Sequence, residues 1–383
     1  MEAEGSVKTP QGDTMVQDPF AARRHALREK MESLALDAVL VTVPENRYYL
    51  SGFEAEDMNL TESSGQLLIG MDRQALLTDF RYEEQAAREA SGYELVVYRE
   101  GWTQVLPDVL RSFGVRRLGV EAHHLTVERF RQVEQALHEV QSKAELWGEE
   151  PLVEAFRMVK DPSELERMRQ ALELAESVFD TIWRGLRPGL SEKEIAWAIE
   201  KGIRESGAEA VSFPPIVASG PNGALPHAVP TARVIGEEDA VILDLGARWH
   251  HYCSDMTRTW LGPRVPAKLR EIYHIVREAQ LAAMDAIRPG VDSHEVDGIA
   301  RGIIDKAGYG AAFGHGLGHG IGLAVHEKPG YGKKTSVVLQ ENMVLTVEPG
   351  IYVSGLGGVR LENMVRVTAE GCECLSRNQW FVE

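Results

Sequence analysis

A short pattern that occurs twice, 101 residues apart, constrains the fold of this 383-residue chain more than any other feature. Residues 186–191 read Leu-Arg-Pro-Gly-Leu-Ser and residues 287–292 read Ile-Arg-Pro-Gly-Val-Asp, each after a helical stretch. In both copies an N-cap residue, a glutamate three positions later and a terminal glycine bound the next helix: Ser191, Glu194 and Gly207, then Asp292, Glu295 and Gly308. Two such units predict two halves related by approximate symmetry, with a site between them.

The chain upstream of this repeat predicts a separate, smaller domain. A chain of this length favours two domains. Strand patterns at 37–42, 65–80 and 118–121, with a helical pattern at 103–113, predict an α/β domain over residues 20–150. The polar, acidic first 19 residues do not resemble a signal peptide, and we expect residues 1–19 to form a disordered tail.

The second predicted domain, residues 151–383, begins with a long amphipathic helix. Pro162 stands at the first helical position, and apolar residues recur every three or four positions after it. The repeat then predicts a pseudo-symmetric α+β architecture for this domain. The fold class is therefore α/β, with a small N-terminal α/β domain followed by a pseudo-symmetric α+β domain.

Charge and cysteine content exclude several classes of function. The formal charge of −17 leaves no broad basic face for nucleic acid or anionic lipid, so we expect neither as a partner. No apolar run reaches the ~18 to 20 residues of a membrane span. Three cysteines build no disulfide framework, which favours a reducing compartment, and we expect a cytoplasmic protein. The Cys-Glu-Cys near residue 373 is expected in a strand.

Four acidic residues interrupt apolar strand patterns in the second domain. A predicted hairpin over residues 241–260 places Asp244 in one strand and Asp255 in the other. A second strand pair, joined by a glycine-rich loop, carries Glu348 and Glu362. Any one of these acids alone would favour a salt bridge. Because isolated charges are costly to bury, four of them together predict a site for cations.

A histidine cluster lies between the two acidic pairs. The segment Gly-His-Gly-Leu-Gly-His-Gly-Ile-Gly-Leu-Ala-Val-His contains His315, His319 and His326. Its alternating glycines disfavour the helix of His-Glu-x-x-His zinc proteases, so we expect an extended segment that sends its histidines to different roles. One imidazole with four carboxylates suits Mn, Co or Fe at least as well as Zn. Two such ions would lower the pKa of a shared water, which predicts hydrolysis.

These segments, with Ser-Gly-Pro-Asn at 219–222 and Pro-His at 226–227, resemble the pita-bread metallopeptidases: methionine aminopeptidase, aminopeptidase P and prolidase (Xaa-Pro dipeptidase). The resemblance extends from about residue 155 to the C-terminus. Residues 46–52 and 78–82 resemble, more weakly, the N-terminal domain shared by prolidase, aminopeptidase P and creatinase. Methionine aminopeptidase lacks that domain and therefore fits less well.

The resemblance implies a role for each candidate residue. It implies two divalent ions, manganese first, with cobalt or zinc as alternatives. It assigns Asp244 to one ion, His319 and Glu348 to the other, and Asp255 and Glu362 as bridges between them. Glu348 would also be the general acid/base for a bridging hydroxide. The remaining catalytic positions that it implies are His227, His315, His326 and Arg360.

The resemblance implies hydrolysis of the Xaa-Pro bond of dipeptides as the first expectation. Aminopeptidase P activity on longer Xaa-Pro peptides is the alternative, because both enzymes share all of these ligands and differ in what closes the pocket beyond the proline. A metal-free creatinase-like or binding protein is the third possibility, which the complete ligand set disfavours. The expected partners are a proline-containing dipeptide or short peptide and, by resemblance, a second copy of the chain in a homodimer.

Overall fold

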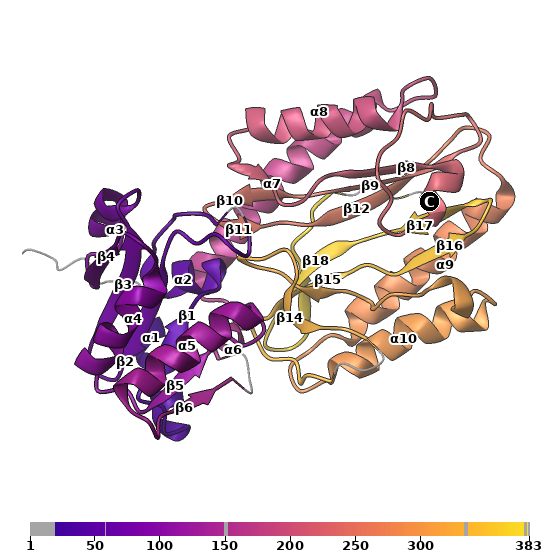
Figure 1. Ribbon diagram of the computed structural model, residues 1–383. Coiled ribbons are helices and arrows are strands. Elements are labelled where there is room, and N and C mark those ends of the chain that lie inside the picture. The colour runs from indigo at the N-terminus through magenta and orange to yellow at the C-terminus, as the bar shows by residue number, and fades with distance from the viewer. Residues whose placement is uncertain (1–19, 58, 149–151, 333–335, 379–380, 382–383) are drawn as a thin grey trace, which may run out of the picture. The chain divides into compact units, whose positions relative to one another are not determined.

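We describe the protein from a computed structural model, which covers residues 20–57, 59–148, 152–332, 336–378 and 381. The chain forms two compact units, Met1–Val153 and Glu154–Glu383 (Figure 1). Each unit has its own hydrophobic core. The predicted tail, residues 1–19, lies outside the described residues. Among the helices of the described chain, none is long and apolar enough to cross a membrane.

The first unit is built on a six-stranded sheet with the order β4-β3-β2-β1-β5-β6. Its core joins buried strand residues to apolar faces of α4 and α5. The strands are β1 (Ala38–Val41), β2 (Gln66–Gly70), β3 (Gln74–Asp79), β4 (Glu94–Tyr98), β5 (Arg117–Val120) and β6 (Glu145–Trp147), and the helices are α1 (Ala21–Ser33), α2 (Pro44–Ser51), α3 (Glu83–Glu89), α4 (Trp102–Ser112) and α5 (Val127–Val140). The predicted hairpin, the other two strands and the helix over 103–113 are confirmed.

The second unit contains two similar halves, residues 162–261 and residues 267–367, which we call the first half and the second half. Each begins with a long helix and a shorter one, and the strands lie between the two helix pairs (Figure 1). The helices are α6 (Val153–Arg157), α7 (Pro162–Gly185), α8 (Glu192–Glu205), α9 (Ala267–Ala286) and α10 (Ser293–Lys306), with short 3-10 turns at η1 (Gly220–Ala224) and η2 (Gly310–Ala312). The helix predicted to start at Pro162 is therefore confirmed.

The repeat in the sequence corresponds to a repeat in the backbone. Ser191 and Asp292 are the N-caps of α8 and α10, as predicted. Each also pairs with a later segment, because Ser191 bridges Val234 and Asp292 bridges Val338. The glycines after the two helices, Gly207 and Gly308, have φ angles of 96° and 86°, a region that glycine enters without steric cost.

The strands of the second unit complete the two halves. In the first half, β9 pairs antiparallel with β8 and β12, and in the second, β15 pairs antiparallel with β18. The strands are β7 (Ala210–Val211), β8 (Ile216–Ser219), β9 (Ala240–Leu245), β10 (Ala247–Trp249), β11 (Tyr252–Cys253), β12 (Met256–Leu261), β13 (His319–Gly320), β14 (Glu327–Gly330), β15 (Val344–Val347), β16 (Gly350–Val353), β17 (Gly357–Arg360), β18 (Asn363–Val367) and β19 (Cys372–Cys374). The Cys-Glu-Cys segment is a strand, as expected, and its thiols are free.

The predicted strand pairs differ from the structure at their ends. Asp255 and Glu362 lie one residue before β12 and β18, and Glu348 lies one residue after β15. Pro349 follows Glu348 and has no N–H to donate, so the ladder of β15 does not continue there. An extra hairpin, β16–β17, fills the connection to β18. These three carboxylates therefore stand just outside the strands, whereas Asp244 lies within β9, as predicted.

Candidate active site

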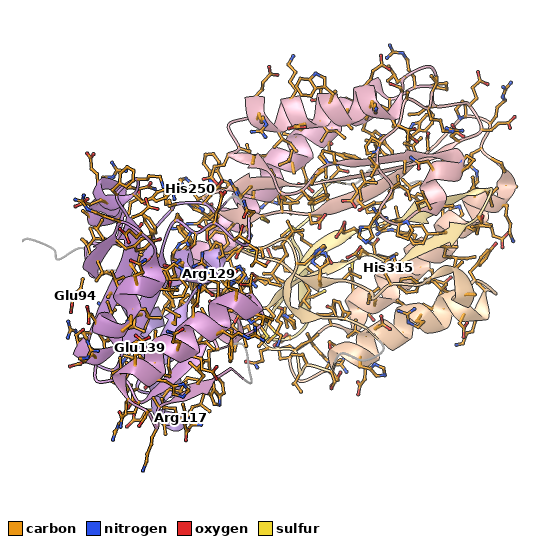
Figure 2. All side chains as sticks on the ribbon, in the orientation of Figure 1. Glu94, Arg117, Arg129, Glu139, His250 and His315 are labelled. Carbon is orange, nitrogen blue, oxygen red and sulfur yellow. The ribbon has the colours of Figure 1, made fainter. Side chains whose placement is uncertain are left out.

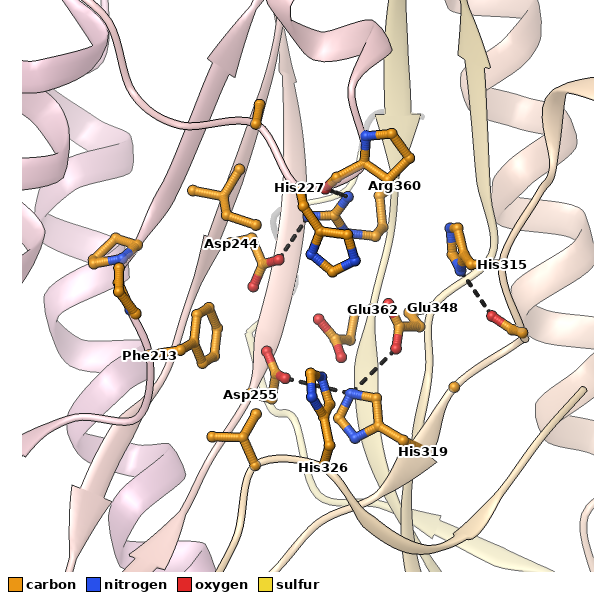
Figure 3. Close-up of a pocket in the computed structure, with 18 of the residues that line it drawn as sticks. Phe213, His227, Asp244, Asp255, His315, His319, His326, Glu348, Arg360 and Glu362 are labelled. Atoms are coloured by element: carbon orange, nitrogen blue, oxygen red, sulfur yellow. Dashed lines mark hydrogen bonds and ion pairs between the residues drawn. The ribbon is translucent and has the colours of Figure 1, made fainter. Parts of the chain in front are cut away.

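A cavity of about 670 Å³ between the two halves is lined by every candidate residue of the sequence analysis (Figure 3). The first half contributes polar groups from the loop after η1 and from β9 and the start of β12, and the second half contributes the histidine segment and the ends of β15 and β17. Those lining residues are His227, Asp244, Asp255, His315, His319, His326, Glu348, Arg360 and Glu362. Side chains separated by more than 100 positions in sequence thus share one site.

The centre of the cavity is a cluster of carboxylates around His319. Asp255, His319 and Glu362 each offer a ligand atom, and these atoms all lie within 4.8 Å of one another. His319 Nε2 lies 3.3 Å from Glu348 Oε1 and 3.7 Å from Asp255 Oδ2. The other ring nitrogen, Nδ1, lies 3.1 Å from the Gly320 carbonyl, which only accepts hydrogen bonds. Nδ1 therefore carries the proton, and the Nε2 lone pair faces the carboxylates.

Burial and mutual repulsion dominate the electrostatics of this cluster. Burial, together with the charges of Glu362 and Asp244, raises the pKa of Asp255 well above its usual range. Burial likewise raises the pKa of Glu362, with Glu348 adding to the effect. The pKa of Glu348 is raised to about 7, first by burial and then by Asp244. Without a counter-charge, such acids retain protons, so the cluster favours the binding of cations.

Several buried oxygens of the cluster fit a metal ligand set. Oδ1 of Asp244, Oδ1 of Asp255 and Oε1 of Glu362 are buried and have no hydrogen-bond partner among the described residues. Buried polar atoms are normally paired, so their lone pairs are available to an ion. Burial lowers the pKa of His319 to about 4, so its imidazole is neutral near pH 7 and suited to ligation. Carboxylate oxygens and one imidazole suit hard divalent cations.

Threonine hydroxyls orient the two glutamates. Thr257 Oγ1 donates to Glu362 Oε2 at 2.8 Å, and Thr346 Oγ1 donates to Glu348 Oε1 at 3.1 Å. Thr346 Oγ1 also accepts a hydrogen bond from the backbone N–H of His319 at 3.0 Å. A Cβ atom at Gly318 would lie 2.2 Å from the Thr346 carbonyl oxygen. The histidine segment therefore runs directly against β15, which confirms an extended conformation and excludes the helical alternative.

Arg360 connects the two halves at one wall of the cavity. Its Nη2 donates to Asp244 Oδ2 at 2.6 Å, and its Nη1 donates to the Pro226 carbonyl at 3.1 Å and to the Tyr352 hydroxyl oxygen at 3.0 Å. This buried ion pair holds one oxygen of Asp244 and leaves Oδ1 facing the cavity. Arg360 thus fixes the orientation of a candidate ligand from the opposite half.

His315 lies in the second half (Figure 2), and the Tyr352 hydroxyl links it to Arg360. Its Nδ1 lies 2.7 Å from the Gly316 carbonyl and its Nε2 lies 2.9 Å from the Tyr352 hydroxyl. Burial lowers the pKa of His315 to about 4, so the ring is neutral near pH 7. Because the carbonyl fixes the proton on Nδ1, Nε2 accepts a hydrogen bond from Tyr352.

Sequence reasoning missed the apolar wall and the tyrosine. Phe213 and Ile216 line the cavity. Phe213 lies on the side of Asp244 and Asp255 (Figure 3), and Ile216 is paired with Asp244 across β8 and β9. Tyr352 lies in β16 with its hydroxyl between Arg360 and His315. An aromatic residue in a strand is usually a core residue, so the sequence carried no separate signal for either role.

Comparison with known proteins places this geometry in a family. A model of metallopeptidase family M24 matches residues 166–369, and a model of the creatinase/prolidase N-terminal domain matches residues 23–159. The chain belongs to metallopeptidase family M24. An uncharacterized peptidase of Bacillus subtilis, a member of the curated relatives, is 38% identical over 345 residues, covering 90% of this chain and 95% of that protein. The predicted family is confirmed.

Solved structures support the same M24 assignment and confirm the fold class. The Xaa-Pro dipeptidase from Bacillus anthracis has a TM-score of 0.87 at 38% identity, covering 94% of this chain and 98% of that chain. The prolidase from Pyrococcus horikoshii OT3 has a TM-score of 0.85 at 32% identity, covering 94% and 100%. An X-Pro aminopeptidase from Thermotoga maritima has a TM-score of 0.79 at 35% identity, covering 91% and 98%. The chain thus combines a creatinase-type N-terminal domain with an M24 pita-bread domain.

Proposed function

We propose that this protein is a metal-dependent peptidase that hydrolyses the Xaa-Pro bond of dipeptides. The observation that carries the proposal is the cluster of Asp244, Asp255, Glu348 and Glu362 around His319, with buried oxygens that have no hydrogen-bond partner among the described residues. Similarity to proteins named Xaa-Pro dipeptidase and prolidase supports the substrate class.

Five residues would hold two divalent ions. Asp244 would bind one ion, His319 and Glu348 the other, and Asp255 and Glu362 both. When bound, the ions would lower the pKa of a water molecule so that it can attack the peptide carbonyl near neutral pH. Three buried carboxylate oxygens of this set have no hydrogen-bond partner among the described residues, which supports the assignment. We propose manganese as the first candidate ion, with cobalt or zinc as alternatives.

Glu348 is the carboxylate best suited to transfer protons. Its side chain is 17% exposed, against 7% for Asp255, so a substrate in the cavity can reach it. Thr346 donates to Oε1, which leaves Oε2 free to accept a proton from the nucleophile and return it to the leaving nitrogen. A leaving proline is a secondary amine, so a placed proton donor at this point accelerates its departure.

The histidines and Arg360 would act on the peptide itself. Both His227 and His326 line the cavity, and neither ring has a hydrogen-bond partner among the described residues. Their N–H groups are therefore free to donate to the scissile carbonyl and to the developing oxyanion. His315 receives the Tyr352 hydroxyl proton, and Arg360 fixes Asp244, so these two groups shape the wall near the substrate.

Metal analysis combined with peptide hydrolysis tests the proposal. Protein purified without chelator should contain divalent metal and hydrolyse Xaa-Pro dipeptides, and added Mn²⁺ or Co²⁺ should restore activity after chelation. If no metal binds and no turnover occurs with either ion, the protein is instead a metal-free binding protein of the same fold. Light scattering tests the homodimer, which we propose on family likeness alone. Cell fractionation tests the cytoplasmic location, which we propose from the cysteine content.

Aminopeptidase P activity is the second candidate. Among the described residues that line the cavity, Arg360 is the single lysine or arginine, and it already pairs with Asp244. No other such cation within this cavity caps the carboxylate of a dipeptide, which would leave room for a longer chain. Rates on Xaa-Pro and on Xaa-Pro-Yaa peptides separate the two activities: preference for the longer peptides would replace the dipeptidase assignment.

A further inference from the structure

A buried carboxylate in the first half lies outside the proposed metal centre. Glu192, the first residue of α8, is fully buried and accepts five hydrogen bonds. Its Oε1 accepts from the N–H and Oγ of Ser219, both at 2.7 Å. Its Oε2 accepts from Asn222 Nδ2 at 2.9 Å and from the N–H and Oγ1 of Thr231 at 2.9 and 2.7 Å. Hydrogen bonds to a charged acceptor are the strong class in proteins.

These five bonds join the two ends of one segment, residues 219–231, which we call the His227 loop. Ser219 and Asn222 are near its start and Thr231 is at its end, so one side chain closes the loop. The loop packs against β17, because a Cβ at Gly358 would lie 2.1 Å from the Gly223 carbonyl. Glu192 therefore fixes the backbone that leads into the cavity.

His227 depends on this backbone for its position. Its ring is exposed to the cavity, and no other described residue hydrogen-bonds or ion-pairs with it. The neighbouring backbone is held at the active site by a hydrogen bond, in which Arg360 Nη1 donates to the Pro226 carbonyl at 3.1 Å. A ring with no bond of its own moves with its loop, and the loop is closed by Glu192.

The second half shows that an equivalent capped helix forms without a buried carboxylate at this position. The equivalent residue at the start of α10 is Ser293, which is also fully buried. Ser293 makes a single side-chain contact of this kind, accepting from the Val337 N–H at 3.2 Å. Both helices start with a capped turn and pair with the following segment. The carboxylate is therefore specific to the half that carries His227.

We propose that Glu192 is a positioning residue for His227. It closes the His227 loop, so that the imidazole is presented to the substrate in one place. This inference rests on the proposed function, because it assigns to that site a residue that does not touch the substrate. Its test therefore needs one measurement that is independent of catalysis.

Glu192→Gln is the principal variant. Each carboxylate oxygen accepts from a backbone N–H, Ser219 at Oε1 and Thr231 at Oε2, and an N–H cannot accept in return. A glutamine NH₂ in either orientation therefore faces one of these N–H groups and loses the hydrogen bond at that end of the loop. We expect kcat for an Xaa-Pro dipeptide to fall roughly 10- to 100-fold, the range typical of residues that orient catalytic groups, with metal content unchanged. The matched control is Glu194→Gln, two residues later, whose carboxylate is exposed and bonds only to the Ser191 cap.

A double-mutant cycle separates positioning from general stability. If Glu192 acts through His227, Glu192→Gln should reduce kcat much less in a His227→Ala background than in the wild type. Full additivity of the two changes would overturn the proposal. Asn222 is half-buried, and Asn222→Ala removes one hydrogen bond to Glu192. This variant should reduce kcat less than Glu192→Gln does, and its effect should again be non-additive with that of His227→Ala.

Hydrogen exchange of the metal-free protein supplies the independent measurement. Glu192→Gln should speed amide exchange in residues 219–231, including the Ser219 and Thr231 amides, and Glu194→Gln should not. Unchanged exchange in this loop would overturn the positioning role even if the variant lost activity. If wild-type protein hydrolyses no Xaa-Pro peptide but the exchange result holds, the proposed function fails while the structural assignment of Glu192 stands.

Discussion

The two halves of the second unit share an architecture but supply different chemistry. Each has a long helix, a capped shorter helix and a pair of antiparallel strands whose ends carry two carboxylates. Asp255 and Glu362 occupy matching places, one residue before β12 and β18. Each half sends an arginine across to the other, because Arg360 pairs with Asp244 and Arg258 donates to the Glu362 carbonyl. Between the two halves as the structure describes them, the glycine-rich histidine segment belongs to the second.

A repeated backbone thus places equivalent carboxylates in both halves, while each half holds its histidine-bearing segment by different contacts. In the first half, Glu192 closes the loop of His227 from the first turn of α8. In the second half, Asp297 of α10 accepts from the Leu317 N–H at 3.0 Å and pairs with Arg301.

The largest effect should come from the matched carboxylates. Asp255→Ala and Glu362→Ala should each abolish metal retention and reduce hydrolysis at least about 1000-fold, beyond the ~10- to 100-fold cost of losing a residue that only orients a ligand. Bound metal and kcat/KM should fall together in both variants, while Asp285→Ala on the exposed face of α9 should match the wild type. Wild-type rates in either variant would contradict the two-metal assignment and the equivalent roles of Asp255 and Glu362.

The second largest effect should be a loss of metal affinity as the pH decreases. Burial raises the pKa of Asp255 and Glu362, and that of Glu348 to about 7, so the metal-free site holds protons that an ion must displace. Affinity should fall about tenfold per pH unit for each proton displaced, as pH decreases from 8 to 5.5. Calorimetric titration measures this, and an affinity independent of pH would contradict it.

The same pKa shifts fix the sign of a stability change in metal-free protein. The folded state holds protons on these carboxyls above the ordinary pKa of about 4, where the unfolded chain has lost them. Between about pH 4 and 6.5 the opposite contribution comes from His315 and His319, which are neutral in the folded state and protonated in the unfolded chain. The free energy of unfolding should therefore decrease as pH rises above about 6.5, where the carboxyls alone still hold extra protons in the folded state. Urea unfolding after chelation should show the decrease, and metal-loaded protein should show little of it.

Asp297→Asn should have a moderate effect confined to the second half. Arg301 donates to the carbonyls of Phe313 and His315 at 2.9 and 2.8 Å, so loss of its partner loosens the segment that carries His315. We expect roughly a tenfold lower kcat. The change should be non-additive with His315→Ala and additive with His227→Ala. The opposite pattern would mean that the two supports are not separate.

The smallest effect should come from the helix caps, where the halves are most alike. Ser191→Ala removes the hydroxyl that accepts from the Glu194 N–H and should reduce the free energy of unfolding by about 1 kcal/mol. Asp292→Ala should shift the thermal midpoint in the same direction. Neither should change kcat for a dipeptide, and a loss of activity in one of them would show that its cap also serves the site.

The residues predicted from the sequence are those whose type does not fit the local pattern of apolar or helical residues. Asp244 stands out because it interrupts an apolar strand, and the glycines around His319 exclude a helix. Glu192 was not detected because it lies within an ordinary capping string between Ser191 and Glu194, where an extra acid is common.

Other features of the site were not predicted because the sequence around them follows an ordinary helix or loop pattern. Asp297 is one polar residue on an amphipathic helix, and its burial depends on a loop that arrives from residues 313–317. For the β16–β17 hairpin, the sequence predicted the glycine-rich loop but not the two strands that it joins. Such roles arise from contacts across the fold, and local patterns do not record those contacts.

The division of the ligands between the halves has a consequence for how the protein matures. Asp244 and Asp255 emerge during synthesis more than sixty residues before His319 and more than a hundred before Glu362. A chain that has folded only its first half presents two aspartates with neither the imidazole nor the remaining carboxylates, and it should hold metal weakly. Tight metal binding would then begin only after the second half has been synthesised and folded. Bound metal would therefore indicate that the two halves of a newly made molecule have assembled.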